Sequence, residues 1–206
     1  MNYQLLRPKE RCLHACLPAF GNITLHRFME ASQPLPIQTD NETHTSPYSV
    51  LAVANEFLNL GSRDLIPVSP MKIQKLLYMA HAYHLCKHNR PLVNEEFEVW
   101  KFGPVLPGLY HKCKHFDQTE IKGFLVYADH DFGKAEPERV PKDDVDAIES
   151  INAIWDQFGK YDPMVLSKWT HVRNGPWDQS RGKTNIIPND LIKRYFDSRV
   201  RKNRNG

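Results

Sequence analysis

Apolar residues recur with a helical period from residue 48 onward, and the first such stretch covers residues 49–61. One face of this stretch carries four apolar side chains at the spacing of an amphipathic helix: Leu51, Ala54, Phe57 and Leu58. Gly61 follows the last of them, and glycine often occupies the position just past a helix C-terminus. The pattern therefore predicts a helix that ends at Gly61.

A longer stretch, residues 69–88, predicts the central helix of the fold. Ser69 is a suitable N-cap, and Pro70 takes the first helical position, where its missing N–H costs nothing. The residues of one stripe are Ile73, Leu76, Leu77, Ala80 and His84, and most of the remaining circumference is covered by Tyr78, Met79, Tyr83 and Leu85. A helix that is apolar on so many sides is packed by several neighbours.

The middle of the chain predicts two short strands and a helix. Residues 95–102 alternate well enough for a strand, and Gly103-Pro104 is expected to break it. Pro107 is expected to begin a helix, with a buried stripe formed by Leu109, Tyr110, Cys113 and Phe116. Residues 122–129 predict the second strand, because they are rich in aromatic and aliphatic side chains.

Three further stretches predict helices towards the C-terminus. Residues 143–163 present one apolar face, formed by Val145, Ile148, Ile151, Trp155 and Phe158. Residues 164–177 predict the next helix, which is ended by Asn174-Gly175-Pro176. The last helix begins at Asn189 and is expected to pack through Leu191, Ile192, Tyr195 and Phe196.

Together these elements predict a single, mostly helical α+β domain with about five helices and a small two- or three-stranded sheet. A chain of 206 residues favours one domain with extensions. Residues 1–46 are rich in Pro and polar residues and lack sustained periodicity, so we expect a weakly ordered N-terminal extension. The domain is expected to cover residues 47–198, followed by a basic tail at 199–206.

Composition narrows the classes of function. A formal net charge of +3 does not indicate a chain built for nucleic acid, and the basic tail is short, so a nucleic-acid partner is not expected. No apolar run is long enough to span a bilayer, so no membrane role is expected. Four cysteines are too few for a disulfide framework, which favours the cytoplasm.

Histidines raise the question of a metal site in the central helix. His81, His84 and His88 fall on one side of it. Seven residues rise about 10 Å along a helix, so His81 and His88 cannot readily share one ion. Because no complete ligand set is visible here or in the Cys12–Cys16 stretch, we expect no bound metal.

The turn after the first strand is a candidate interaction surface. Prolines fix its backbone at low entropic cost, and it is expected to display Trp100, Lys101, Phe102 and Tyr110. The alternative, which the residues leave open, is that the Trp and Phe are buried and the turn merely joins strand to helix.

His171 carries the enzymatic alternative. It could act as a general base with Asp178, Glu96 or Glu98 as its partner, in a hydrolytic enzyme. No nucleophile motif or cofactor fingerprint accompanies it, so neither catalytic residues nor a cofactor are expected. The more ordinary role is to tie the end of its helix to the turn at residues 100–103.

Four separated blocks of the sequence resemble the successive motifs of the Panacea antitoxin domain family, also described as GepA or SocA-like. The blocks are MKIQKLLYMAHAYHL, RPLVNEEFEVWKFGPVLPGLYHKCK, LSKWTHVRNGPWDQSRG and NIIPNDLIKRYF. They agree in order and spacing across residues 48–196, and they do not include the N-terminal 46 residues.

The resemblance implies a bacterial, plasmid-borne or phage-associated antitoxin that neutralises a cognate toxin protein by direct binding. A protease is a second implied partner, because SocA-type members are linked to handing the bound toxin to one; a protease adaptor is therefore an alternative function. The shared blocks place the expected partner-binding residues in the turn at residues 100–110 and in a later corner at residues 171–177: Trp100, Lys101, Phe102, Gly103, Pro104, Tyr110, His171, Arg173 and Trp177.

Overall fold

The computed structural model describes residues 46–127 and 136–202, with the side chains described up to residue 198. Within these ranges the fold is α+β, as predicted, with seven α-helices, one 3-10 helix and one three-stranded sheet. The helix count exceeds the expected five. The predictions for residues 1–45 and for the end of the basic tail lie outside the described residues.

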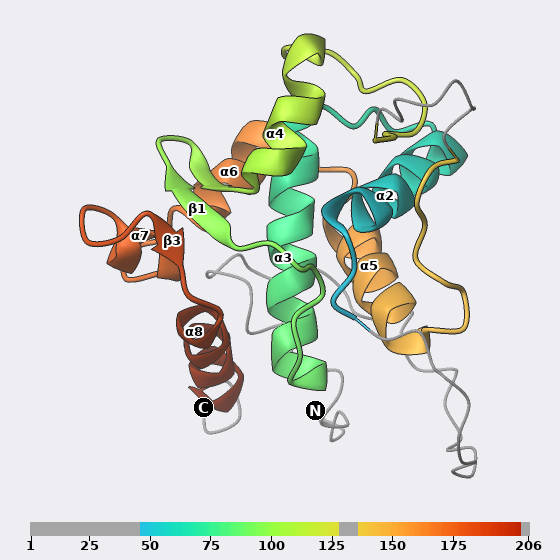
Figure 1. The fold of residues 1–206 in the computed structure, drawn as a ribbon. Helices are drawn as coiled ribbons and strands as arrows, with labels where there is room; N and C mark the ends of the chain where they lie inside the picture. The colour runs from blue at the N-terminus through green and yellow to red at the C-terminus, as the bar shows by residue number, and fades with distance from the viewer. Residues whose placement is uncertain (1–45, 128–135, 203–206) are drawn as a thin grey trace, which may run out of the picture.

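The central helix is α3, Pro70–His88, as the sequence predicts. Ser69 caps it by accepting a hydrogen bond from the N–H of Lys72, and Asn89 ends it in the left-handed conformation. Helices α2 (Val50–Asp64), α5 (Val145–Phe158), α6 (Pro163–Thr170) and α8 (Asn189–Lys202) surround it (Figure 1). This arrangement explains why α3 is apolar around most of its circumference.

Gly61 does not end the first predicted helix. Helix α2 continues through Gly61 to Asp64 and ends at Leu65, whose φ is 55°. A Cβ atom at Gly61 would lie 2.8 Å from Cγ2 of Val68 and 2.9 Å from the backbone oxygen of Ile66. Glycine is therefore needed here for the close approach of the following chain, and its role as a helix stop was wrong.

The sheet has the order β2-β1-β3 and is antiparallel throughout. Strand β1 is Phe97–Trp100, β2 is Gly103–Val105 and β3 is Ile186–Ile187. The predicted strand does end, but it ends at Trp100. Gly103-Pro104 was predicted to break it and instead forms the start of β2. Pro104 is tolerated since β2 is an edge strand and needs no donor from that position on its free side.

Residues 122–127 pair with no strand in the described part of the chain, so the predicted second strand is wrong as a member of the sheet. The predicted helix at 164–177 is two helices, α6 and the short α7 (Pro176–Ser180), with Asn174 at a φ of 61° between them. Strand-type residues and a helical period are local signals, whereas pairing and helix breaks depend on the neighbours in space.

Helix α4, Pro107–Cys113, begins at Pro107 as expected and is followed by the 3-10 helix Lys114–Phe116. Leu109 and Cys113 are buried, but Tyr110 is 41% exposed and does not belong to the buried stripe. Val145 is likewise exposed at the start of α5. No helix in the described residues combines the length and apolar character needed to cross a membrane.

Candidate partner-binding surface

The tip of the β1–β2 hairpin is fastened to the 167–177 segment through the backbone carbonyls of Trp100 and Phe102, and His171 lies beside the carbonyl of Lys101 between them. The indole Nε1 of Trp177 donates to the oxygen of Trp100 at 2.9 Å. Nε2 of His171 lies 3.4 Å from the oxygen of Lys101, and the Ser167 hydroxyl donates to the oxygen of Phe102 at 3.3 Å. The structure therefore joins the turn and the later corner into one unit.

Gly103 is the residue that permits this contact. Its φ is +99°, and a Cβ atom there would lie 2.7 Å from Oγ1 of Thr170 and 2.9 Å from Nζ of Lys75. The same atom would lie 3.0 Å from Cε1 of His171. Both the positive φ and the lack of space for a side chain therefore require glycine where the hairpin meets α3 and α6.

Two polar residues of α3 hold β2 and the residue that follows it. The Gln74 amide accepts from the N–H of Leu106 at 2.9 Å and donates to the oxygen of the same residue at 3.1 Å. Nζ of Lys75 donates to the oxygen of Pro104 at 3.0 Å. Lys75 is buried, and burial lowers the pKa of its amine to about 7.

Gln74 and Lys75 were not predicted to support this surface. The available signal was their adjacency on a helix that is otherwise apolar on most sides. Buried amides and amines need hydrogen-bond partners, so such a pair indicates backbone groups of another segment close by.

The sequence-predicted residues of this surface lie at three depths. Lys101, Phe102, Tyr110 and Arg173 are exposed, and of the two aromatic side chains Phe102 is the more exposed, at 58%. Trp100 and His171 are half-buried. Gly103, Pro104 and Trp177 are buried, so they can support the surface but present little area to a partner.

Aromatic contacts fix the orientation of the hairpin tip. The rings of Trp100 and Tyr110 lie 4.8 Å apart between centroids, and Nε1 of Trp100 donates to Oε2 of Glu98 at 2.6 Å. The rings of His171 and Trp177 lie 4.1 Å apart, edge to face. These contacts hold aromatic side chains in defined positions before any partner binds.

His171 is engaged by backbone groups. Its Nδ1 lies 2.6 Å from the oxygen of Ser167, and its Nε2 faces the oxygen of Lys101. Of the proposed carboxylate partners, Asp178 accepts from the N–H of Asn174 at 2.9 Å, and Glu98 accepts from Trp100. The polar contacts of His171 are therefore to the backbone of its own helix and of the turn, and within the described residues none is to Asp178, Glu96 or Glu98.

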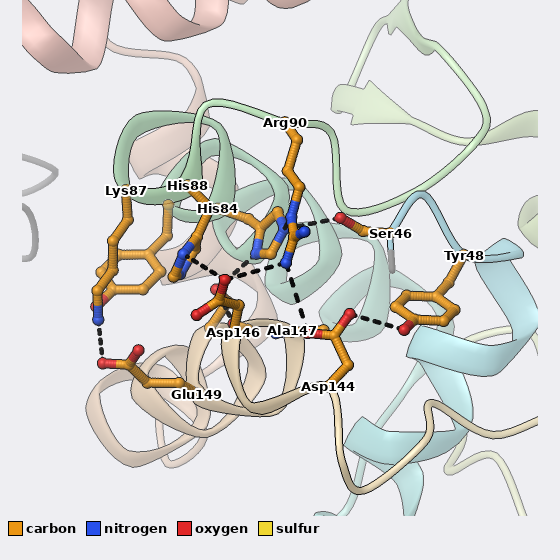
Figure 2. A network of polar contacts seen from close by, with 12 residues as sticks. Ser46, Tyr48, His84, Lys87, His88, Arg90, Asp144, Asp146, Ala147 and Glu149 are labelled. Carbon is orange, nitrogen blue, oxygen red and sulfur yellow. Dashed lines mark hydrogen bonds and ion pairs between the residues drawn. The ribbon is translucent and has the colours of Figure 1, made fainter. Parts of the chain in front are cut away.

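The opposite end of α3 carries a polar network that joins it to α5 and to the start of the described chain (Figure 2). His84 is buried, with its Nε2 2.9 Å from Oγ of Ser46 and its Nδ1 2.9 Å from Oγ of Ser150. His81 is also buried and lies 2.9 Å from Oδ1 of Asn189. Burial lowers the pKa of His81 to about 4 and that of His84 to about 3.

One group in the described residues brings together three side chains of metal-binding type: His88, Asp146 and Glu149. Each carboxylate already has a cationic partner, since Lys87 pairs with Glu149 and Arg90 lies 3.1 Å from Asp146 (Figure 2). These two positive charges oppose a further cation, and the group is best described as an ion-pair network.

Comparisons with known proteins agree with the resemblance seen in the sequence. A family model described as "Antitoxin SocA-like, Panacea domain" matches residues 73–178, which include the hairpin, α4 and the 167–177 segment. Antitoxin SocA of Caulobacter vibrioides (strain NA1000 / CB15N) is 36% identical over 133 residues, covering 62% of this chain and 67% of that protein. No solved structure matches.

Proposed function

Because the chain belongs to the SocA-like Panacea antitoxin family, we propose that it neutralises a cognate toxin by direct protein binding. The proposed contact surface consists of the exposed hairpin-tip residues together with the corner beside them. The residues expected to touch the toxin are Lys101, Phe102, Tyr110 and Arg173, with Trp100 and His171 at the edge.

The observation that carries this proposal is the anchoring of the hairpin tip. Three consecutive carbonyls, those of Trp100, Lys101 and Phe102, each face a side chain of the 167–177 segment. A tip held in this way keeps the backbone of an exposed aromatic residue and of a lysine in place. Less backbone entropy is then lost on binding, and aromatic and basic residues are common interface anchors.

Positive charge gives the surface a preferred partner. Lys101 and Arg173 are exposed, and no carboxylate pairs with either within the described residues. Unpaired charges at the rim of an interface steer encounter and select a complementary patch. We therefore expect the toxin to present acidic or hydrogen-bond-accepting groups here.

The test is co-expression with each reading frame that neighbours the gene. A frame that arrests growth alone, and whose effect this chain relieves, encodes the toxin. The Lys101→Glu/Arg173→Glu chain should fold normally but lose protection, whereas Lys142→Glu/Lys160→Glu should protect like the parent. The control changes the net charge equally, at two exposed positions elsewhere.

Dosage separates binding from the alternatives. A binder protects only when its amount approaches that of the toxin, whereas a hydrolytic enzyme or a protease adaptor acts repeatedly. Protection by trace amounts of the chain would contradict the binding proposal. Retained protection in a His171→Phe variant would argue against an enzyme that uses this histidine as a base.

A further inference from the structure

Residues 124–127 have strand-type side chains but no strand partner within the described residues. The segment reads Phe-Leu-Val-Tyr, and aromatic and β-branched residues favour extended backbone in a sheet. The segment follows α4 and the 3-10 helix in the chain, and it does not belong to the β2-β1-β3 sheet. A segment of this composition outside any sheet needs an explanation.

A buried amide holds the segment from one side. Asn55 on α2 donates through Nδ2 to the oxygen of Leu125 at 2.9 Å, and its Oδ1 accepts from the N–H of Leu125 at 2.8 Å. One amide can meet both groups of one residue only where that residue is extended. The Gln74 amide meets both backbone groups of Leu106 in the same way. The backbone of Leu106 is extended, with a φ of −94° and a ψ of 110°.

The other edge of the segment has no backbone partner within the described residues. In a strand, the backbone groups of alternate residues point to opposite edges, so those of Phe124 and Val126 face away from Asn55. Among the described contacts, neither N–H donates to a protein acceptor. In the described part of the chain, the oxygen of Val126 accepts from the flexible amine of Lys112 alone, at 3.3 Å. An edge of this kind is able to pair with a further strand.

Exposed side chains accompany the open edge. Phe124, Val126 and Tyr127 are 42%, 38% and 47% exposed. Cations steady the two rings, since Arg139 lies 4.9 Å from the centre of Phe124 and Lys112 lies 5.1 Å from that of Tyr127. Arg139 is paired with Glu56, whereas no carboxylate pairs with Lys112 within the described residues.

We propose that the 124–127 segment binds an extended, apolar segment of the toxin as an added β-strand, with an acidic residue of the toxin facing Lys112. Backbone pairing would satisfy the N–H groups of Phe124 and Val126, and alternate side chains of the added strand would cover Phe124 and Val126. The inference rests on the proposed antitoxin function and adds a second contact to the hairpin surface.

The direct test is amide hydrogen exchange of the full-length chain, alone and in complex with the toxin identified by growth rescue. The amides of Phe124 and Val126 should exchange at least about tenfold more slowly in the complex. Unchanged exchange of these two amides in a saturated complex would overturn the inference. Slowing in the free chain that grows with its concentration would also overturn it, because a second copy would then be the strand partner.

A pair of variants separates backbone from side chain. Val126→Pro removes the open N–H, and the extended Leu125 before it is compatible with proline. Val126→Pro should raise the Kd of the toxin complex about tenfold or more, because one backbone hydrogen bond is lost and the proline ring blocks the added strand. Val126→Thr keeps the N–H and should bind within about threefold of the parent. Equal binding by the Pro and Thr variants would contradict the inference.

Failure of this inference is distinguishable from failure of the proposed function. One outcome is that Lys101→Glu/Arg173→Glu no longer binds the toxin, while the parent complex leaves amide exchange at residues 124–127 unaltered. In that case the added strand is wrong and the proposed function stands. If no complex forms with any toxin, the proposed function is wrong and the added strand falls with it.

Discussion

Trp177 and Trp100 are 77 positions apart in the chain, and a hydrogen bond of 2.9 Å joins the indole of the first to the backbone oxygen of the second. This bond links two blocks of the sequence that are each rich in aromatic and basic residues. It also places His171, Ser167 and Thr170 against the hairpin tip. The candidate surface is therefore formed by two segments that are far apart in the sequence and meet only in the folded chain.

Trp177→Phe tests this link by removing the donor while keeping an aromatic ring. We expect a loss of about 1–3 kcal/mol in the free energy of unfolding, because the Trp100 oxygen loses its partner. The amides of the hairpin should exchange faster. Trp155→Phe is the matched control, since it removes an indole bond of 2.7 Å to Asp64 at a distant position. A similar change in hairpin exchange for both variants would contradict a local role for Trp177.

Gly103→Ala should be more damaging than its size suggests. The strained backbone costs roughly 1–3 kcal/mol, and the added methyl group meets Thr170, Lys75 and His171. Gly182→Ala provides the control, because Gly182 has a φ of +75° with nothing within 4 Å of an added Cβ. Denaturant unfolding should show a clearly larger loss at Gly103. Equal losses would mean that the space beside Gly103 is not restricted.

Lys75 should make stability depend on pH above neutrality. Its pKa is about 7 in the folded chain against an ordinary value of 10.5, because burial disfavours the charged amine. Between these values the unfolded chain binds more protons, so the free energy of unfolding should rise with pH. Denaturant unfolding from pH 7 to 10 measures this rise, and Lys75→Met should flatten it. An unaltered curve for the variant would contradict the burial of a titrating amine.

His81 should make the free energy of unfolding depend on pH below neutrality. Burial lowers its pKa to about 4 from an ordinary 6.5, so its contribution is fully present above 6.5 and is lost as pH falls towards 4. The slope for one such group is about 1.4 kcal/mol per pH unit. His81→Gln should reduce the slope of the unfolding free energy by about this amount between pH 6 and 4.5. The same slope in parent and variant would contradict the prediction.

Local pattern was sufficient for the central helix and for the fold class. Ser69, Pro70 and the apolar circumference of α3 lie within one stretch, so propensity, capping and periodicity all indicate the same helix. The start of α4 was predicted from Pro107, which takes the first helical position there as Pro70 does in α3. The family resemblance was also carried by short motifs and is confirmed.

Pairing in space was not accessible from the same patterns. Gly103-Pro104 has the composition of a strand break, but it pairs with Val99 and Trp100 as the start of β2. Strand β3 is two residues long, which is too short for any periodic signal. Residues 122–127 have strand composition, but the chain brings no described strand beside them, and an amide of α2 takes that place.

The most direct test of the proposed function is the dissociation constant of the toxin complex for three full-length chains. We expect Lys101→Glu/Arg173→Glu to keep the parental melting temperature, because exposed substitutions rarely cost more than about 0.5 kcal/mol. It should weaken the Kd at least about tenfold, mainly through loss of charge complementarity. Lys142→Glu/Lys160→Glu should match the parent in both measurements. A folded Lys101→Glu/Arg173→Glu chain that binds the toxin as tightly as the parent would contradict the assignment of this surface.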